Sequence, residues 1–141
     1  MARLSSLERR TKETDITIEL NLDGSGKCDI VTPSGFFSHM LGALARHSGF
    51  DLTCRVQGDV DVDLHHTVED TGLVLGQVLL QALGNKAGIE RYGQSLLPMD
   101  DALVLVAVDL SGRPYFASDL TFPQERAGEF PAVLALEFFR A

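Results

Sequence analysis

Two stretches of the chain carry the same order of features, and this recurrence constrains the fold more than any other property of the sequence. Ile16–Lys27 (ITIELNLDGSGK) and Leu103–Pro114 (LVLVAVDLSGRP) each contain a strand-like apolar run, an aspartate, a Ser-Gly turn and a basic residue. A Phe-Phe pair follows each of them, at 36–37 and at 138–139. The likeness is short enough to arise by chance. If it is a true repeat, the chain holds two related units, and the second breaks off partway through its first helix.

The spacing of apolar residues predicts the elements of these units. Ile16–Asn21 alternates as a half-buried strand does, and we expect Lys27–Val31 to return as its hairpin partner. Leu103–Leu110 and Pro114–Leu120 are expected to form a second hairpin. The other expected elements are a strand over Phe50–Val56, helices over Phe36–His47 and His65–Leu83 with Asp63 as a possible N-cap, and an amphipathic segment over Pro131–Ala141.

Composition and charge limit the classes of partner. The chain has 141 residues, of which 45% are hydrophobic, as in an ordinary globular domain. Its formal charge of −8 argues against a nucleic-acid partner, because phosphate backbones are bound by dense Lys and Arg. No signal peptide and no apolar run of about 18 residues can be found. We therefore expect a cytoplasmic protein with no membrane partner, in which Cys28 and Cys54 are reduced thiols.

The segment Asp63–Asp70 (DLHHTVED) is the densest group of chemically active residues. On a helix, His65 and Glu69 are four residues apart and share one face, and His66 can also meet Glu69. Adjacent histidines point about 100° apart, so they suit two ions on either side of the helix end. Imidazole with carboxylate favours Mn, Fe or Zn over Ca. The alternative is a solvated first turn whose acidic residues suit the helix dipole.

Two further histidines lie on the predicted 36–47 helix. His39 supplies a third imidazole on an otherwise apolar helix, although a lone histidine in such a place is more often a satisfied core residue. His47 lies two turns further along and could face the same way. Three histidines near one predicted site favour metal binding.

The remaining candidates are ambiguous when taken singly. Arg91 and Arg113 follow turns and could clamp a phosphate, because guanidinium makes bidentate contacts with phosphate oxygens, or they could be surface charges. Glu13 and Asp100 are unremarkable alone. The order Pro98–Ala102 puts Asp100 at a strand edge, where functional sites often form.

The motifs taken together resemble those of imidazoleglycerol-phosphate dehydratases. In the order seen in that family, the chain carries R-T-K-E-T (10–14), L-N-L-D-G (20–24), G-F-F-x-H-M-L (35–41), H-H-T-V-E-D (65–70), R-Y-G (91–93), P-M-D (98–100) and D-x-S-G-R-P (109–114). Each motif alone is weak, whereas the combination is specific. The resemblance runs from about Arg9 to Arg140.

The resemblance implies an α+β fold of two similar α/β halves, each a sheet covered on one face by helices. The first half would be residues 1–90, with the HHxxE motif, and residues 91–141 an incomplete second half. Members of the family are homo-oligomers that form large symmetric shells, with active sites between subunits and two Mn2+ ions per complete site. They are lyases of histidine biosynthesis that convert a small phosphorylated imidazole, D-erythro-imidazole glycerol phosphate, into imidazole acetol phosphate.

By the same resemblance, individual residues acquire roles. The metal ligands would be His39, His65, His66 and Glu69. The substrate would be contacted by Glu13, His39, His47, His65, Glu69, Arg91 and Arg113, with the two arginines toward its phosphate. Glu13 would be the catalytic acid and base, and Asp100 would help to position the reacting groups.

Three departures from the family pattern bear on activity. Ser38 stands where members usually have an Asp that could orient the neighbouring imidazole. Glu137 stands where many members have a His ligand, and it could bind manganese or be a solvated helix residue. The second HHxxE motif is absent, so we expect a truncated form or a second chain that supplies the rest. The alternatives to a dehydratase are a non-catalytic, metal-binding, self-associating fragment and a zinc hydrolase on His65, His66 and Glu69.

Overall fold

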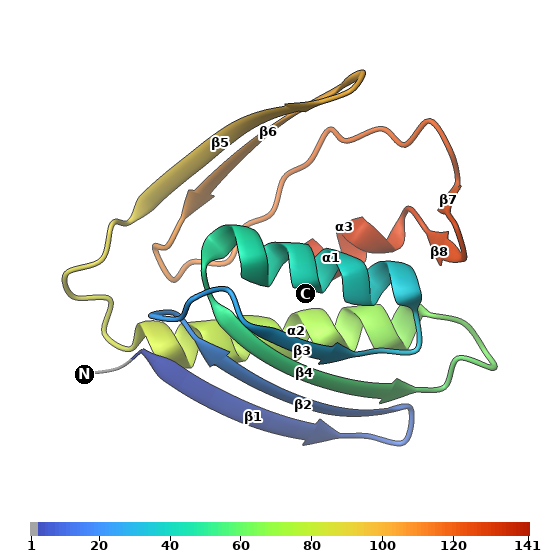
Figure 1. Cartoon of the computed structure of the whole chain (residues 1–141), viewed down its shortest axis with the longest axis horizontal. Coiled ribbons are helices and arrows are strands. Elements are labelled where there is room, and N and C mark those ends of the chain that lie inside the picture. The colour runs from blue at the N-terminus through green and yellow to red at the C-terminus, as the bar shows by residue number, and fades with distance from the viewer. Residues whose placement is uncertain (1–2) are drawn as a thin grey trace. The chain divides into compact units, whose positions relative to one another are not determined.

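A four-stranded sheet is the base of the first of two units in the computed structural model, which describes residues 3–141. This unit comprises residues 3–84 and 118–141, and the second comprises residues 85–117. The sheet has the order β1-β2-β4-β3 (Figure 1), with β1 at Leu4–Arg10, β2 at Thr14–Asn21, β3 at Cys28–Val31 and β4 at Asp51–Gly58. β2 is antiparallel to β1 and to β4, whereas β3 is parallel to β4.

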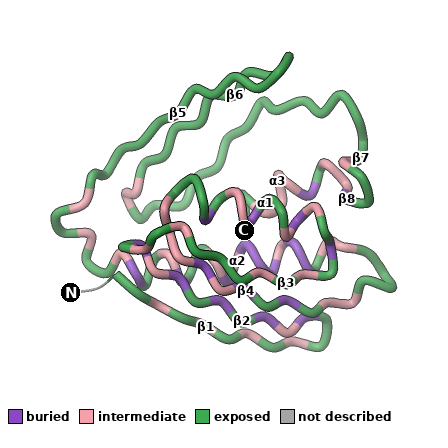
Figure 2. The backbone as a smooth tube through the Cα atoms, viewed as in Figure 1, coloured by how far each residue is buried: buried purple, intermediate pink, exposed green. Residues whose placement is uncertain are grey.

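Two helices, α1 (Gly35–Ser48) and α2 (His65–Leu83), cover one face of this sheet. The alternation in β2 follows from this arrangement, since Ile16 and Ile18 are fully buried while Thr17 and Glu19 face outward. Figure 2 shows the buried stretches of backbone where helices and sheet meet. The predicted α+β class is confirmed. No helix between residues 3 and 141 has both the length and the apolar character needed to cross a membrane.

The ends of both helices follow local signals in the sequence. α1 begins after Ser34, whose hydroxyl accepts the N–H of Phe37 at 3.2 Å, and ends at Gly49, whose φ of 76° suits glycine. α2 ends at Gly84 (φ 55°). The predicted helices over 36–47 and 65–83 and the strand over 50–56 are therefore confirmed, to within one or two residues at their ends.

The predicted hairpin between 16–21 and 27–31 is wrong. Both edges of β2 are occupied, by β1 and β4, so β3 pairs on the far side of β4.

The loop 22–27 that leads from β2 to β3 is held by Asp51, whose carboxylate accepts the backbone N–H groups of Ser25 (2.8 Å) and Lys27 (3.0 Å). These two hydrogen bonds, that of Ser25 first, lower the pKa of Asp51. Only glycine fits at position 24, because a Cβ there would lie 2.3 Å from the Asp51 nitrogen.

The C-terminal segment returns to the first unit. It contains the two-residue strands β7 (Arg126–Ala127) and β8 (Phe130–Pro131) and the short helix α3 (Leu134–Arg140). The ring of buried Phe130 stacks on Phe37 with centroids 5.9 Å apart, and Phe138 meets Phe37 edge-on at 5.7 Å. α3 packs on α2, so the predicted amphipathic stretch at 131–141 completes the core.

The second unit is a hairpin of β5 (Tyr92–Met99) and β6 (Ala102–Asp109). The predicted pairing of 103–110 with 114–120 is wrong, because β6 pairs with the strand before it through a tight turn at Asp100–Asp101. Pro114 has no N–H to offer at the start of a return strand. All residues of β5 and β6 are exposed. The predicted division into two related halves, 1–90 and 91–141, is about common descent, whereas the two units of the structure are defined by their internal contacts. The division into halves therefore stays a prediction.

The close contact of α2 with α3 at Gly72 allows a test of how α3 packs. A Cβ at Gly72 of α2 would lie 2.6 Å from the Phe138 carbonyl oxygen and 3.1 Å from the Ala141 Cβ. We expect Gly72→Ala to lower the free energy of unfolding by about 1–3 kcal/mol, because α3 must move away. Gly76→Ala on the same helix has open space and should raise it by about 0.5–1 kcal/mol. Urea unfolding followed by circular dichroism measures both; equal effects would contradict the docking.

The two thiols are expected to differ in reactivity. Burial raises the pKa of Cys54 to about 12, whereas Cys28 is exposed. Iodoacetamide should modify only Cys28 in the native protein at pH 8 and both thiols in urea, as read by peptide mass spectrometry. The thiol of Cys54 ionises at a lower pH in the unfolded chain than in the fold. The free energy of unfolding should therefore fall progressively as pH rises from about 9 toward 12. Cys54→Ala should remove that dependence, and rapid native labelling of Cys54 would refute its burial.

Candidate functional site

The first turns of α2 carry the imidazole and carboxylate groups of the HHxxE motif. His65 Nε2 lies 3.5 Å from Glu69 Oε2, and both side chains are more than two-fifths exposed. This pairing follows from the four-residue spacing, which puts both groups on one helix face. His65 and Glu69 therefore form a solvent-accessible pair of nitrogen and oxygen donors.

His66 is held from the other side by Asp59, which the sequence did not single out. His66 Nδ1 lies 3.0 Å from Asp59 Oδ2. The hydrogen bond to Asp59 comes first among the causes that raise the pKa of His66, ahead of the charges of Asp59, Glu13 and Asp63. The Asp59 backbone N–H in turn donates to the Glu13 carbonyl oxygen at 3.0 Å. A carboxylate on Nδ1 fixes the ring and directs Nε2 outward, as in carboxylate–histidine–metal arrangements.

The helix start itself differs slightly from the prediction. The N-cap residue is Leu64, not Asp63, and its side chain makes no cap hydrogen bond. Asp63 instead accepts the backbone N–H of His65 at 2.7 Å from one position further out. An aspartate bonding two residues ahead forms a local turn that sets the direction in which the chain enters the helix.

The two neighbouring histidines diverge. Their ring centroids are 6.1 Å apart and their planes meet at 88°. Across the described residues 3–141, no three His, Cys, Asp or Glu side chains gather closely enough to hold a metal ion. The motif therefore presents two separate pairs, His65 with Glu69 and His66 with Asp59, rather than one closed site.

The candidates on α1 and α3 lie outside these two pairs. His39 and His47 are exposed on α1, in its second and last turns. The Ser38 hydroxyl lies 2.9 Å from that of Thr32, so it bonds the preceding loop. Glu137 Oε1 lies 2.9 Å from Arg140 Nη1 within α3. Both alternatives for Glu137, a metal ligand and a solvated helix residue, stay predictions.

The remaining candidates belong to the second unit. Arg91 pairs with Asp109 in a bidentate manner, with Nε–Oδ1 at 2.7 Å and Nη2–Oδ2 at 3.1 Å. Its guanidinium carbon also lies 4.9 Å from the centre of the Tyr92 ring. Asp100 occupies the hairpin turn with φ 51°, a left-handed conformation that aspartate tolerates. Arg113 follows the 111–112 turn, and its backbone N–H donates to the Ser111 hydroxyl at 3.2 Å.

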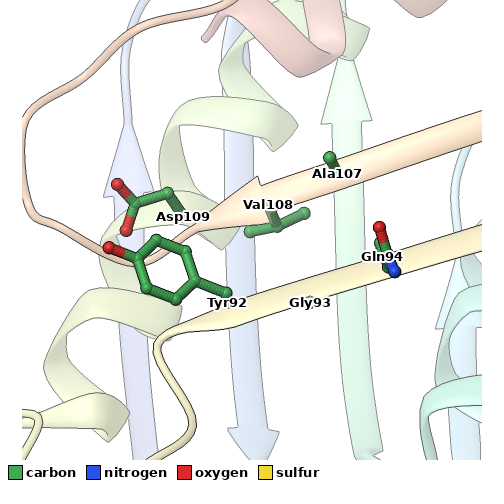
Figure 3. A pocket seen from close by; sticks show the side chains of 6 residues that line it. All are labelled: Tyr92, Gly93, Gln94, Ala107, Val108 and Asp109. Atoms are coloured by element: carbon green, nitrogen blue, oxygen red, sulfur yellow. The ribbon is translucent and has the colours of Figure 1, made fainter.

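A recess of about 490 Å³ begins at the base of this hairpin (Figure 3). Tyr92 and Asp109, which are directly opposite in the strand register, lie at its end. The lining residues are Tyr92, Gly93, Gln94, Ala107, Val108 and Asp109. All six residues are exposed, so the recess is open to solvent rather than enclosed. The recess lies in the second unit, whereas the HHxxE pairs belong to the first, so the candidate residues fall into two groups.

No role was predicted from the sequence for two acidic residues, Asp59 and Asp70, although Asp70 lies within the motif at 65–70. Asp70 is almost buried and accepts the Thr14 hydroxyl at 2.5 Å, and Arg9 Nη1 lies 2.5 Å from the same carboxylate oxygen. These contacts fix the start of α2 to β1 and β2. Asp59 had one signal, its position in the turn between the predicted strand over 50–56 and the motif. The partners of Asp70, Thr14 and Arg9, are too distant in sequence to infer.

Comparison with known proteins gives concordant matches. Residues 32–141 match the profile of the family described as imidazoleglycerol-phosphate dehydratase. The imidazoleglycerol-phosphate dehydratase of Acetivibrio thermocellus is 55% identical over all 141 residues, which span 72% of that protein. That of Gluconobacter oxydans is 53% identical over 99% of the chain and 71% of its own length. The crystal structure of the Staphylococcus aureus imidazoleglycerol-phosphate dehydratase superposes with a TM-score of 0.85 at 38% identity, covering 97% of this chain and 75% of that one.

The Asp59–His66 contact predicts a pH response of the metal-free protein. Asp59→Asn should bring the pKa of His66 down toward its ordinary value of 6.5, because the carboxylate that favours the imidazolium is lost. Since the fold raises this pKa, His66 stabilises the native state at low pH, and the contribution is lost as pH rises through the folded pKa. NMR titration of the imidazole protons measures the shift. Exposed Asp61→Asn is the control, and an unchanged His66 pKa in Asp59→Asn would contradict the contact.

Proposed function

The chain belongs to the imidazoleglycerol-phosphate dehydratase family, hydro-lyases of histidine biosynthesis, and from this premise we propose that it dehydrates D-erythro-imidazole glycerol phosphate to imidazole acetol phosphate. The observation that carries the proposal is the HHxxE motif at the start of α2, with His66 held by Asp59 and His65 beside Glu69. We propose the cytoplasm as its compartment.

The chemical type of the side chains in the HHxxE motif fits a divalent ion such as Mn2+. Imidazole nitrogen and carboxylate oxygen suit Mn, Fe or Zn, and because His66 Nδ1 is engaged by Asp59, His66 would hold an ion through Nε2. His65, His66 and Glu69 would hold the ions, with His39 as a further ligand. Because the described residues offer pairs rather than triads, we propose that another copy of the chain completes each site, as in a homo-oligomer with sites between subunits.

The reaction removes a proton that is not next to a carbonyl, so no enolate can take up the developing charge. Bound Lewis-acidic ions would supply stabilisation of the charge on the substrate's imidazole ring. Glu13 is the proposed acid and base; it is exposed and adds to the negative field at His66. Asp59 keeps the His66 ring in one orientation.

The other substrate contacts are proposed from side-chain type and position. Arg91 and Arg113 would bind the phosphate, since guanidinium groups suit phosphate oxygens. His39 and His47 would line the pocket around the substrate's imidazole, together with His65 and Glu69. Asp100, held in the turn between β5 and β6, would position groups at the reacting centre.

A non-catalytic, metal-binding, self-associating fragment is the second candidate. One observation favours it: the imidazole and carboxylate groups form pairs, and no group of three, among residues 3–141. Exposed apolar side chains on β5 and β6, such as Leu97 (65% exposed) and Leu105 (68%), are suited to pairing with another chain.

The test is dehydration of imidazole glycerol phosphate by the purified chain, with Mn2+ and with a chelator control. Turnover that requires Mn2+ is expected. Glu69→Gln should lower kcat/KM by about 100-fold or more, because a proposed ligand loses its charge. The matched control is Glu19→Gln, an exposed residue on the uncovered face of the sheet, which should leave kcat/KM unchanged.

Two results would contradict the proposal in different ways. Mn2+ binding by a folded protein without turnover, measured by electron paramagnetic resonance, would support the second candidate. Turnover that Glu69→Gln leaves intact would mean that dehydration does not use the HHxxE site.

A further inference from the structure

The positive charges of the second unit gather at one end of its hairpin. Residues 85–117 contain only three basic side chains, Lys86, Arg91 and Arg113. All three act on the Asp109 carboxylate, which is opposite Tyr92 at the hairpin base. The acidic pair Asp100–Asp101 lies in the turn at the other end, seven residue pairs along the ladder, or roughly 24 Å. The hairpin therefore separates charge along its length.

Lys86 reaches the turn that precedes Arg113. A Cβ built on Gly112, which has φ +82°, would lie only 2.6 Å from Lys86 Nζ. The ammonium group therefore lies directly over the 111–113 turn. Lys86 itself has a left-handed backbone conformation, with φ 59°.

Asp109 balances only part of this charge. Its carboxylate is hydrogen-bonded by Arg91, which comes first among the causes that lower the pKa of Asp109, and the charges of Arg113 and Lys86 act in the same direction. At this end of the hairpin three cations stand against two carboxylates, Asp109 and Glu90, which leaves one positive charge in excess although the whole chain carries −8. Arg91 is directly ion-paired with Asp109, whereas Lys86 and Arg113 act on that carboxylate through their charge and make no direct ion pair among the described residues. The guanidinium of Arg91 also retains donors beyond the two that Asp109 accepts.

We propose that Lys86 is a third phosphate-contacting residue beside Arg91 and Arg113, and that Asp109 is the counter-ion that holds Arg91 in position. The ligand class is a small phosphate monoester, with the adjoining recess of about 490 Å³ taking its non-phosphate part. This inference rests on the proposed function for the roles of Arg91 and Arg113. It adds to that function a residue whose position in sequence, just after a helix end, gave no sign of ligand contact.

The test is an NMR titration of the 15N-labelled chain with inorganic phosphate at low ionic strength. We expect shifts of the Gly112 and Arg113 amides and of the Arg91 side-chain N–H that saturate and that weaken as salt is added. Lys86→Gln should weaken phosphate binding roughly twofold to fivefold, the effect of one exposed charge contact. Lys86→Arg should restore it. Both variants keep a non-glycine residue at φ 59°, so backbone strain is matched.

Lys27→Gln is the control for the loss of one positive charge, because Lys27 is exposed in the first unit. It should bind phosphate as the unaltered chain does. The inference is overturned if Lys86→Gln binds phosphate with unchanged affinity, or if phosphate shifts no signal within residues 85–117.

The two proposals fail separately. Phosphate binding that depends on Lys86, in a chain that does not dehydrate imidazole glycerol phosphate, would remove the proposed function and leave this site standing. Dehydration with the same KM in Lys86→Gln as in the unaltered chain would keep the function and exclude Lys86 from substrate binding.

Discussion

The packing of α2 against β2 is the contact on which the rest of the first unit depends. Ile16 and Ile18 from the strand and Val68, Val74 and Val78 from the helix are fully buried, and each contributes about 1.5–3 kcal/mol. At one end the apolar contact gives way to a polar one, where Asp70 of α2 accepts the Thr14 hydroxyl and pairs with Arg9. That network secures the helix turn from which the imidazoles project, so the position of the candidate site is a consequence of core packing.

The local periodicity of apolar residues was enough to predict the helices and β4. It was not enough to predict which strands pair over long distances in the sequence. α1 and α2 have apolar faces at helical spacing with clear ends, and both were predicted nearly to the residue. β1 was missed because only Leu7 gives its inner face an apolar side chain among polar neighbours. Both predicted hairpins assigned a strand the wrong partner: β4 rather than β3 pairs with β2, and β5, which was not predicted, pairs with β6. The apolar pattern of a strand does not say which neighbour it pairs with.

The corrected pairings nevertheless bear on the recurrence in the sequence. β2 and β6 contain the recurring segments, and each pairs antiparallel with the strand that precedes it. β2 also pairs with β4 on its other edge, whereas β6 pairs with β5 alone, so the repeat stays a prediction. For the candidate site, the motif pointed to His65, His66 and Glu69, whereas Asp59 became visible only through its contact with His66. Sequence spacing can identify donors within one helix, but it cannot identify the groups that orient them from a neighbouring loop.

Glu129 connects late and early parts of the chain, and this has a consequence for synthesis. Its carboxylate accepts the Ser34 hydroxyl at 2.7 Å and the Phe36 N–H at 3.2 Å, and neighbouring Phe130 closes the core beside Phe37. Helix α1 is therefore completed by residues that the ribosome adds more than ninety positions later. A growing chain must hold the sheet and both helices without this cover until those residues emerge. Contacts of such sequence separation slow folding and prolong the exposure of apolar surface, so the nascent protein is expected to depend on chaperones more than its small size suggests.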